Sequence, residues 1–277
     1  MANVSVNTNV GAMIALQNLN KTNKDLSETQ NRINTGLKVA SAKDNGAVYA
    51  IAQSQRADVA ALGAVSDSLN RAMSAVDVAM AAGEGVSDIL TQMKELALSA
   101  SDTGLDTVSR DALKEDFQSL RDQIKKTITN AVFNGINLLE AGADGINALA
   151  SADGANKLTV AAQDISLGGS ILTLASDATF STATTASGLL TTLDASIKNV
   201  SLALSRLGTS SKSLEAHLSF VSKLTDSMEA GIGNLVDADM AKESAKLQSL
   251  QTKQQLGIQA LSIANQAPQT ILSLFQG

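Results

Sequence analysis

The sequence predicts a mainly α-helical protein: an elongated antiparallel helical bundle or coiled-coil rod, with a small β-hairpin region and paired N- and C-terminal helices. Aliphatic residues recur at alternating steps of four and three over long stretches, which is coiled-coil spacing. Aromatic residues make up only 2% of the chain, so the helices pack through smaller side chains. The single proline, Pro268, leaves long segments free to form unbroken helices.

The N-terminal segment carries a narrow apolar stripe. Ala12, Leu19, Leu26 and Ile33 lie seven residues apart, which places them on one face of a helix. The glycine-containing stretch GLKVASAKDNG (36–46) follows as a connector.

Residues 44 to 100 form a second long helical pattern. Its apolar residues are again spaced by seven, with a neighbouring row beside them, and Gly83 and Gly85 weaken its middle enough to allow a kink. An unbroken helix of this length would reach about 80 Å at ~1.5 Å per residue, which predicts a rod. The row with this spacing comprises Leu62, Leu69, Val76 and Leu90, and Gly83 occupies its place between the last two.

A third helix is predicted over residues 113–131, where Leu113, Phe117, Leu120 and Ile124 follow helical spacing, and it ends at the turn pair 134–135. Residues 141–188 differ in character and are rich in Gly, Ala, Ser, Thr and Asp. Two strand-like runs, KLTVAA (157–162) and SILTLAS (170–176), predict a hairpin with its turn at 168–169. The polar tract STATTAS (181–187) is expected to be a surface loop.

The longest seam lies between Leu193 and Leu235. Only Ser211 and Thr225 interrupt an apolar row that keeps coiled-coil spacing throughout. The row comprises Leu193, Ile197, Val200, Leu204, Leu207, Ser211, Leu214, Leu218, Val221, Thr225, Met228, Ile232 and Leu235.

The C-terminal segment is expected to be a helix that begins near Asp237 or Asp239, either of which can act as its N-cap. Met240, Leu247, Leu261 and Phe275 repeat the seven-residue spacing of the N-terminal stripe once Gln254 and Pro268 are stepped over. Burying one apolar stripe on each of two helices gains less free energy than is lost in conformational entropy when both segments become ordered. We therefore expect the two ends to become ordered when they assemble with other copies.

These segments predict two domains. Residues 1–43 with 236–277 form a terminal helix-pair domain, and residues 44–235 form a helical rod domain that includes the hairpin and loop region 141–188. The formal charge of −6 argues against a nucleic-acid partner, and no apolar run reaches the ~20 residues of a membrane span. The N-terminus lacks the basic and apolar regions of a cleavable signal peptide.

No catalytic or cofactor chemistry is predicted. The chain has no cysteine and one histidine, His217, which we interpret as a residue flanking the seam. Neither a nucleophile with its base nor a phosphate-binding glycine loop nor a metal-binding motif is recognisable. We therefore expect no enzyme activity, no cofactor and no metal; an enzyme or small-molecule binder would need a convergent polar cluster.

Three stretches resemble bacterial flagellin. Residues 6–52 are similar to its N-terminal signature, residues 235–275 to its C-terminal signature, and LTQMKELALSASD (90–102) with FNGINLL (133–139) to a third region. The resemblance covers more than a third of the chain, in the right order and at both ends. The alternative is a hook–filament junction protein of the flagellum, which has similar terminal helices.

The resemblance implies a structural subunit that polymerises into the flagellar filament, with the two chain ends paired in its inner tube. It also implies a short form without large outer domains, an extracellular location and export through the flagellar type III apparatus. The implied partners are other copies, other flagellins, hook-junction and cap proteins and an export chaperone. The implied subunit contacts are Leu16, Leu19, Leu26, Ile33, Leu247, Leu250, Ile258, Leu261, Ile271, Leu272 and Phe275.

Two further surfaces follow from the resemblance. One is a surface for an innate immune receptor at Gln92, Lys94, Glu95, Leu96 and Asp116; Gln92 stands where a basic residue is usual, so we expect weak receptor activation. The other is O-glycosylation of Ser and Thr within residues 176–211. A role as an immune ligand is compatible with the structural role.

Overall fold

The structure is a computed structural model that describes the backbone of residues 8–274 and the side chains of residues 8–266. The chain divides into two compact units. One, the terminal unit, comprises Met1–Ala57 with Ser227–Gly277; the other, the middle unit, comprises Asp58–Asp226. The long helices α2 and α4 each contribute residues to both units.

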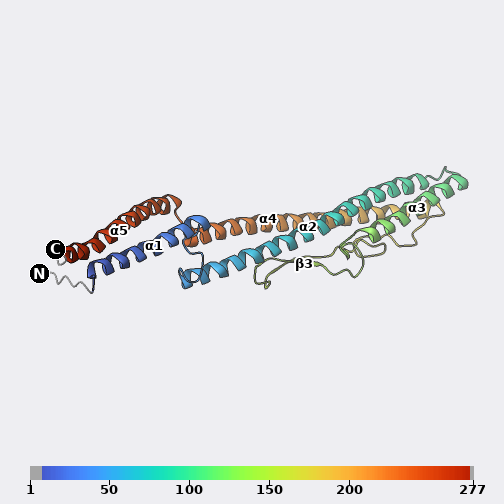
Figure 1. Cartoon of the computed structure of the whole chain (residues 1–277). Helices are drawn as coiled ribbons and strands as arrows, with labels where there is room; N and C mark the ends of the chain where they lie inside the picture. Colours follow the sequence, from blue (N-terminus) through green and yellow to red (C-terminus); the bar gives the residue numbers. More distant parts are fainter. Residues whose placement is uncertain (1–7, 275–277) are drawn as a thin grey trace. The chain divides into compact units, whose positions relative to one another are not determined.

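Among the described residues, five helices and two small antiparallel strand pairs confirm the predicted fold class (Figure 1). The elements in chain order are α1 (Val10–Thr35), α2 (Gly46–Ala100), α3 (Thr107–Asn130), β1 (Val132–Phe133), β2 (Ile136–Asn137), β3 (Ile146–Leu149), β4 (Lys157–Val160), α4 (Ala183–Val236) and α5 (Met240–Leu274).

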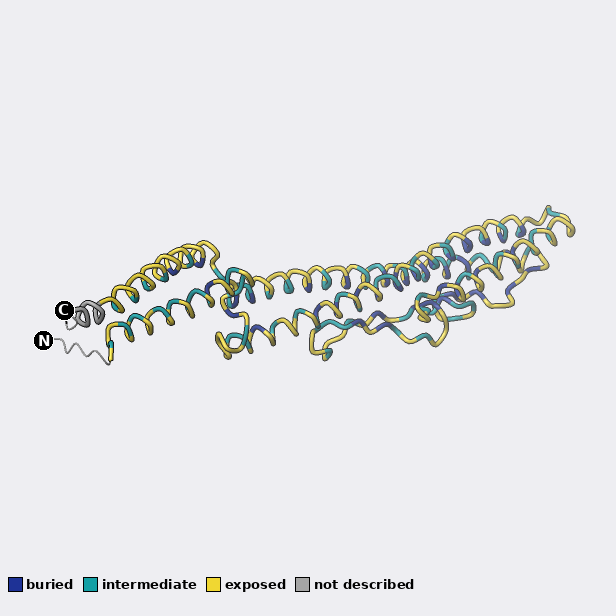
Figure 2. The backbone as a smooth tube through the Cα atoms, in the orientation of Figure 1, coloured by how far each residue is buried: buried dark blue, intermediate teal, exposed yellow. Residues whose placement is uncertain are grey.

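The core of the middle unit follows the predicted seams. Along α4 every seam position is buried or half-buried, and the fully buried positions from Leu193 to Val221 recur every seven residues. Along α2 two rows with the same spacing are buried, one through Leu62 and Leu69 and the other through Val65. Figure 2 shows this buried stripe along α2 and α4 within the middle unit. Coiled-coil spacing therefore identified the packing faces of both long helices.

At Gly83 and Gly85, where a kink was allowed, α2 continues as one helix without interruption. Gly83 is buried against α4, and a Cβ added there would lie only 2.7 Å from Leu204 Cδ2. The glycine at residue 83 therefore allows the close approach of two helices.

The connection between α2 and α3 is held by charged side chains. The guanidinium of Arg110 donates hydrogen bonds to the carbonyls of Ala100, Asp102 and Leu105 at 3.1, 2.9 and 3.0 Å. Asp106 caps the N-terminus of α3. The loop is thus closed by one cation that satisfies carbonyls left free at a helix end.

The predicted end of the third helix needs correction. α3 ends at Asn130, and Asn134 and Gly135 form the turn of a short hairpin between β1 and β2. Both turn residues have positive φ, 50° and 80°, as a two-residue hairpin turn requires. The turn pair was recognised correctly, but it belongs to the hairpin rather than to the helix end.

The predicted partner of the strand at 157–162 is also wrong. β4 pairs with β3, with Ile146 opposite Val160, and within the described segment 170–176 no strand forms. Leu172 and Leu174 of that segment are nevertheless fully buried. The alternating apolar pattern of this segment therefore reflects the burial of every second side chain. An extended segment can bury its side chains in this way without pairing to a neighbouring strand.

The tract STATTAS is not a loop throughout, because α4 begins at Ala183. The Thr182 hydroxyl accepts a hydrogen bond from the Thr185 amide at 3.2 Å, and the Thr185 hydroxyl accepts one from the Thr182 amide at 3.0 Å. The polar, low-complexity composition led to the prediction of a loop. The same hydroxyl residues in fact form a reciprocal cap at the start of α4.

In the terminal unit, the connectors after α1 and before α5 lie together. Gly36 ends α1 with φ 72°, and its carbonyl accepts a hydrogen bond from the Ala238 amide at 2.9 Å. The amides of Lys38 and Val39 donate to the carbonyl of Val236 at 2.7 and 3.2 Å. Segments from opposite ends of the chain are therefore joined by main-chain hydrogen bonds.

Of the two predicted caps of α5, Asp239 is the one used. Its carboxylate accepts hydrogen bonds from the amides of Ala241 and Lys242 at 3.0 and 3.1 Å. The cap satisfies amides in the first turn that have no partner inside the helix.

Candidate functional site

The helices α1 and α5 lie side by side and antiparallel in the terminal unit (Figure 1). Near one end of the pair, the Asn9 amide group donates to the carbonyl of Ala264 at 2.7 Å, while its side-chain oxygen caps α1. Further along, Leu19 packs on Gly257, where an added Cβ would lie 3.3 Å from Leu19 Cδ1. The absence of a side chain at residue 257 lets the two helices approach closely.

At the other end of the pair, Arg32 joins α1 to α5. Its guanidinium contacts Glu243 of α5 at 3.3 Å and Glu28 of α1 at 2.6 Å. Thr29 is fully buried one turn earlier, and its hydroxyl has no hydrogen-bond partner among the described residues. Polar Thr29 and Glu243 therefore occupy two of the three buried positions among the described residues of this helix pair, where an apolar seam was expected; the third is Leu250.

The contact residues implied by the flagellin resemblance that have described side chains fall into three groups within this pair: buried, half-buried and exposed. Leu250 is buried, whereas Leu16 and Ile258 are exposed. Phe275 lies outside the described residues, and the side chains of Ile271 and Leu272 lie outside them as well. The half-buried group is Leu19, Leu26, Ile33, Leu247 and Leu261.

Several exposed apolar residues of the pair were missed by the sequence reasoning. Val10, Met13 and Ile14 of α1 are more than half exposed, as are Leu256 and Ile263 of α5. Their spacings of three, four and seven are visible in the sequence. They escaped notice because the stripe between α1 and α5 was taken as the only apolar face of each helix.

The predicted immune-receptor residues are partly brought together. Gln92, Glu95 and Leu96 of α2 line one surface pocket of about 390 Å³ with Asp116 of α3. Lys94 instead forms an ion pair with Asp194 of α4 at 2.6 Å. The lysine therefore faces a different neighbour from the other four residues.

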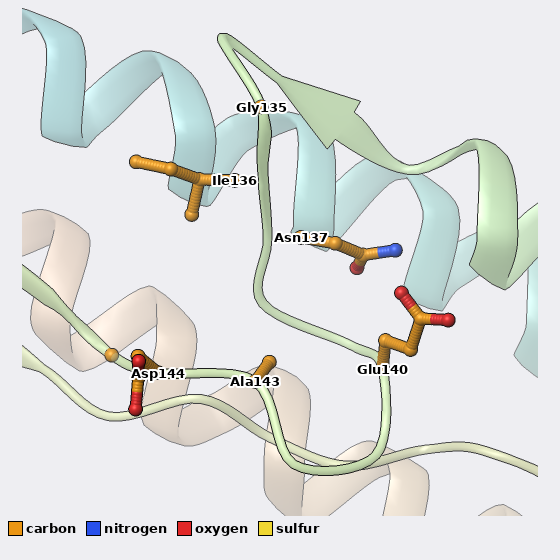
Figure 3. Close-up of a pocket in the computed structure, with 7 residues that line it drawn as sticks. Gly135, Ile136, Asn137, Glu140, Ala143 and Asp144 are labelled. Carbon is orange, nitrogen blue, oxygen red and sulfur yellow. The ribbon is translucent and has the colours of Figure 1, made fainter.

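A second surface pocket, of about 400 Å³, lies beside the β1–β2 hairpin and is lined by Ile136, Asn137, Glu140 and Asp144 among others. Figure 3 shows Asn137 and Glu140 on one side of it and Asp144 on the other. The Asn137 amide group donates to the carbonyl of Ile128 at 2.8 Å and its oxygen accepts from the Leu139 amide. Both polar atoms of the Asn137 side chain are thus hydrogen-bonded to the backbone, where they hold the loop in place.

Several of the remaining polar groups have structural partners. His217 hydrogen-bonds the carbonyl of Ala150 at 2.8 Å, which ties α4 to the β3–β4 hairpin. Hydrogen bonds from Ser41, Ser109 and Ser151 lower the pKa of Asp44, Asp106 and Asp153 respectively below its usual range. Within the described part of the chain, no group of three His, Cys, Asp or Glu side chains has a metal-binding arrangement. None of the described helices is long and apolar enough to cross a membrane.

Comparison with known families follows the same division of the chain. The model of the bacterial flagellin N-terminal helical region matches residues 6–144, and that of the C-terminal helical region matches residues 190–275. These matches define a structural protein with a helical region at each end of its chain.

Relatives match over the whole length. A Caulobacter vibrioides protein named flagellin FljK is 58% identical over 100% of both chains, and a flagellin of Brucella melitensis is 38% identical over 99% of both. A crystal structure of Bacillus cereus flagellin aligns with 55% of this chain and 86% of its own, at 24% identity and a TM-score of 0.49. The chain belongs to the bacterial flagellin family, in a short form without a large outer domain, and is a structural subunit of the flagellar filament. These comparisons lend no support to the hook–filament junction alternative.

Proposed function

We propose that the α1/α5 pair is the surface through which copies of this chain join to form the filament. The observation that supports this most strongly is that each helix of the pair has an apolar face turned away from the other helix. Such faces are costly in water and are covered when a partner packs against them.

On α1, Val10, Met13 and Ile14 lie on the side opposite Ala12 and Leu19, which are half-buried. At 100° per residue the two sets are about half a turn apart. The outer set continues only into polar residues further along α1, so the apolar face covers just the first turns of this helix.

On α5, Leu256 and Ile263 share a face because they are seven residues apart, and Ile263 is 69% exposed. Gly257 and Ala264, which approach α1, point elsewhere on the helix. The residues between Leu256 and Ile263 on the outer side are small or polar, as Ala260 is. A helix of another copy could therefore come close to α5 at this point.

The two outer faces belong to different helices, so they are chemically distinct surfaces at the same end of the pair. When the α1 face of one copy packs on the α5 face of the next, the contact is heterologous. A heterologous contact leaves one face free at each end of the growing chain of copies. When the rotation between copies does not close a ring, such a contact propagates into an open helical filament, whereas a self-complementary contact would stop at a dimer.

Removal of residues 236–277 tests this assignment. We expect the full chain to form filaments, seen by sedimentation and electron microscopy, and the truncated chain to stay monomeric. Circular dichroism should show that the truncated chain keeps a helical core, because the middle unit has its own buried seams. Filaments from the truncated chain would show that α5 is dispensable for assembly.

A matched pair of substitutions sharpens the test. Ile263→Glu places a charge in the proposed contact, and Ser262→Glu places the same charge on an adjacent exposed position. We expect Ile263→Glu to raise the critical concentration for assembly by at least tenfold, or about 1.4 kcal/mol or more, because a buried charge is costly. Equal effects of the two substitutions would argue against a specific apolar contact at residue 263.

We further propose a division of labour between two domains, 1–43 with 236–277 at the inner tube and 44–235 outside it. The division of the structure into a terminal and a middle unit supports this in outline. The other proposed partners are other flagellins, hook-junction and cap proteins and an export chaperone. The chain is proposed to have no enzyme activity, which the structural role of the family supports.

Two surface roles remain proposals. The shared pocket of Gln92, Glu95, Leu96 and Asp116 supports a receptor surface, and Gln92→Arg should raise receptor signalling in reporter cells if the amide weakens binding. O-glycosylation of Ser and Thr within 176–211 is supported by exposed hydroxyls such as Thr191 and Ser205. An intact mass equal to the sequence mass would rule the modification out.

A further inference from the structure

The apolar seam between α1 and α5 does not by itself define one register. The contact that interlocks the helices most closely is Leu19 on Gly257. Ala264 is the next small residue seven positions along α5. If α5 slid by seven residues, Leu19 would lie over Ala264, and the seam would again present a small residue to a large one.

The contact at the other end of the pair has no such repeat. Arg32 is paired with Glu243, whose side chain is 11% exposed, and the Arg32 side chain is itself only 24% exposed. After a slide of seven residues, Arg32 would lie level with Leu250, which is buried. There the guanidinium would face a leucine in a covered position, and it would lose Glu243 and keep only Glu28, the more exposed of its two carboxylate partners.

The environment of Arg32 adds to this selectivity. Its Nε, the second carboxylate oxygen of Glu243 and the Thr29 hydroxyl are all buried and have no partner among the described residues. A seam selected only for stability would fill these positions with apolar side chains. Polar residues inside a coiled-coil seam, by contrast, are known to specify register at a cost in stability.

We propose that the Arg32–Glu243 pair fixes the register of α1 against α5. A slide of seven residues requires the hydrogen bond from the Ala238 amide to the Gly36 carbonyl to open. Once it is open, the pair selects the one alignment in which the guanidinium meets the Glu243 carboxylate, whereas the apolar stripe supplies adhesion in either register. The alignment decides where the outer faces of α1 and α5 lie relative to each other. The inference therefore bears on the proposed assembly surface, although pairing within one chain is measured separately from assembly.

The chain has no cysteine, so introduced pairs report the register without background. A Cβ added at Gly11 lies 4.0 Å from the Cβ of Ala264, within the ~3.5–4.5 Å range of a disulfide. Gly11→Cys with Ala264→Cys therefore reports the observed register. Asn18→Cys with Ala264→Cys reports the register shifted by seven, because residue 18 lies about 10.5 Å further along α1 at ~1.5 Å per residue.

The pairs are oxidised in filaments assembled from the full chain, and the products are separated on non-reducing gels. A disulfide within one chain gives a fast-migrating monomer, and a disulfide between chains gives a dimer. With Arg32 and Glu243 present, we expect closure through residue 11 and little through residue 18. With Arg32→Met and Glu243→Leu together, we expect closure through residue 18 to rise about tenfold.

Glu28→Gln is the matched control, since it removes the more exposed partner of Arg32 on the same helix and should leave both closure yields unchanged. If the double variant does not assemble alone, it is doped into filaments of the cysteine-free chain. Closure through residue 11 only, in the double variant, would overturn the proposal, and so would dimers in place of closed monomers. Failure of the cysteine-free chain itself to assemble would instead count against the proposed assembly function.

Discussion

The middle unit and the terminal unit share one helical spacing but reach very different degrees of burial. In the middle unit, seam residues such as Leu69 and Leu214 are fully buried. Along α1, Thr29 is the one buried residue among those described, and α5 adds Glu243 and Leu250 (Figure 2). Spacing of four and three therefore identifies the faces that pair, but not how much of the remaining surface is covered.

The physical reason lies in the number of neighbours that each helix has. In the middle unit, α3 and the loop segments add further covering to the α2/α4 pair, and Phe117 meets Phe180 edge to face at 5.3 Å. A pair of helices with no third layer can bury one stripe each and must leave the rest in water. The terminal unit has such a pair, and we propose that other copies cover its outer apolar faces.

The largest expected difference between the units is the cost of truncating a seam leucine. Leu214→Ala should destabilise the chain by about 2–5 kcal/mol, because the residue is fully buried and a cavity remains. Leu261→Ala, at a half-buried position of α5, should cost about 1 kcal/mol or less in the unassembled chain. Urea unfolding of monomers measures both values.

Assembly should reverse this order. Leu261→Ala is expected to raise the critical concentration for filament growth, whereas Leu214→Ala should alter it little at temperatures where the chain stays folded. Equal unfolding costs for the two substitutions would mean that the α1/α5 pair is as well packed as the middle unit in the single chain, contrary to the comparison.

The seams could be predicted because each is a local repeat. The residues from Leu193 to Leu235 lie on one face of their helix, and the spacing alone defines that face. The family signatures at the two ends of the chain indicated that these ends pair with each other. A cap at Asp237 or Asp239 was likewise readable, since a cap acts within three residues of itself, and the structure uses Asp239.

Contacts between residues far apart in the sequence could not be predicted in this way. The partner of β4 depended on where residues 138 and 139 run, since they accept hydrogen bonds from the amides of Gln163 and Ile165 at 2.7 and 3.0 Å. The Arg32–Glu243 pair joins residues far apart in sequence, and its register signal appears only once α1 and α5 are aligned. Outward apolar faces such as that of Val10 were visible as spacing, but their exposure depends on what surrounds the helix.

A smaller effect is expected at the glycines of α2. Gly83→Ile should cost about 1–3 kcal/mol, because its Cβ would lie 2.7 Å from Leu204 Cδ2 and the helices would have to part. Gly85→Ala should stabilise the same helix by up to about 1 kcal/mol, since nothing lies within 4 Å of an added Cβ there. Thermal unfolding followed by circular dichroism compares them.

A smaller side chain on α4 provides the control for these two substitutions. The double variant Gly83→Ile with Leu204→Ala should recover part of the stability lost in Gly83→Ile, because it removes the leucine side chain that the new isoleucine would contact too closely. Destabilisation by Gly85→Ala as large as that by Gly83→Ile would indicate that α2 needs flexibility at these positions, and close contact with α4 would not be the reason for Gly83.

The smallest expected effect is the response of the two units to a lower pH. The pKa of Asp106 in the middle unit is lowered by hydrogen bonds from the Ser109 hydroxyl and amide, and that of Asp44 in the terminal unit by hydrogen bonds from the Ser41 amide and hydroxyl. A carboxylate with a lowered pKa in the folded state contributes its stability above its unfolded pKa of ~3.9 and loses it as pH falls through the folded value.

Acidification from about pH 5 to pH 3 should therefore loosen both turns. Hydrogen exchange should rise around residues 41–48 and 107–110 in the intact chain, and Asp106→Asn should remove the pH dependence at the second site only. Because Asp44 lies in the connector after α1, its protonation should also speed exchange in α1, which has few buried contacts to resist opening. α3 should stay protected, since Phe117, Ile124 and Ile128 hold it in the core. Equal acid-induced exchange in α1 and α3 would contradict a difference in packing between the two units.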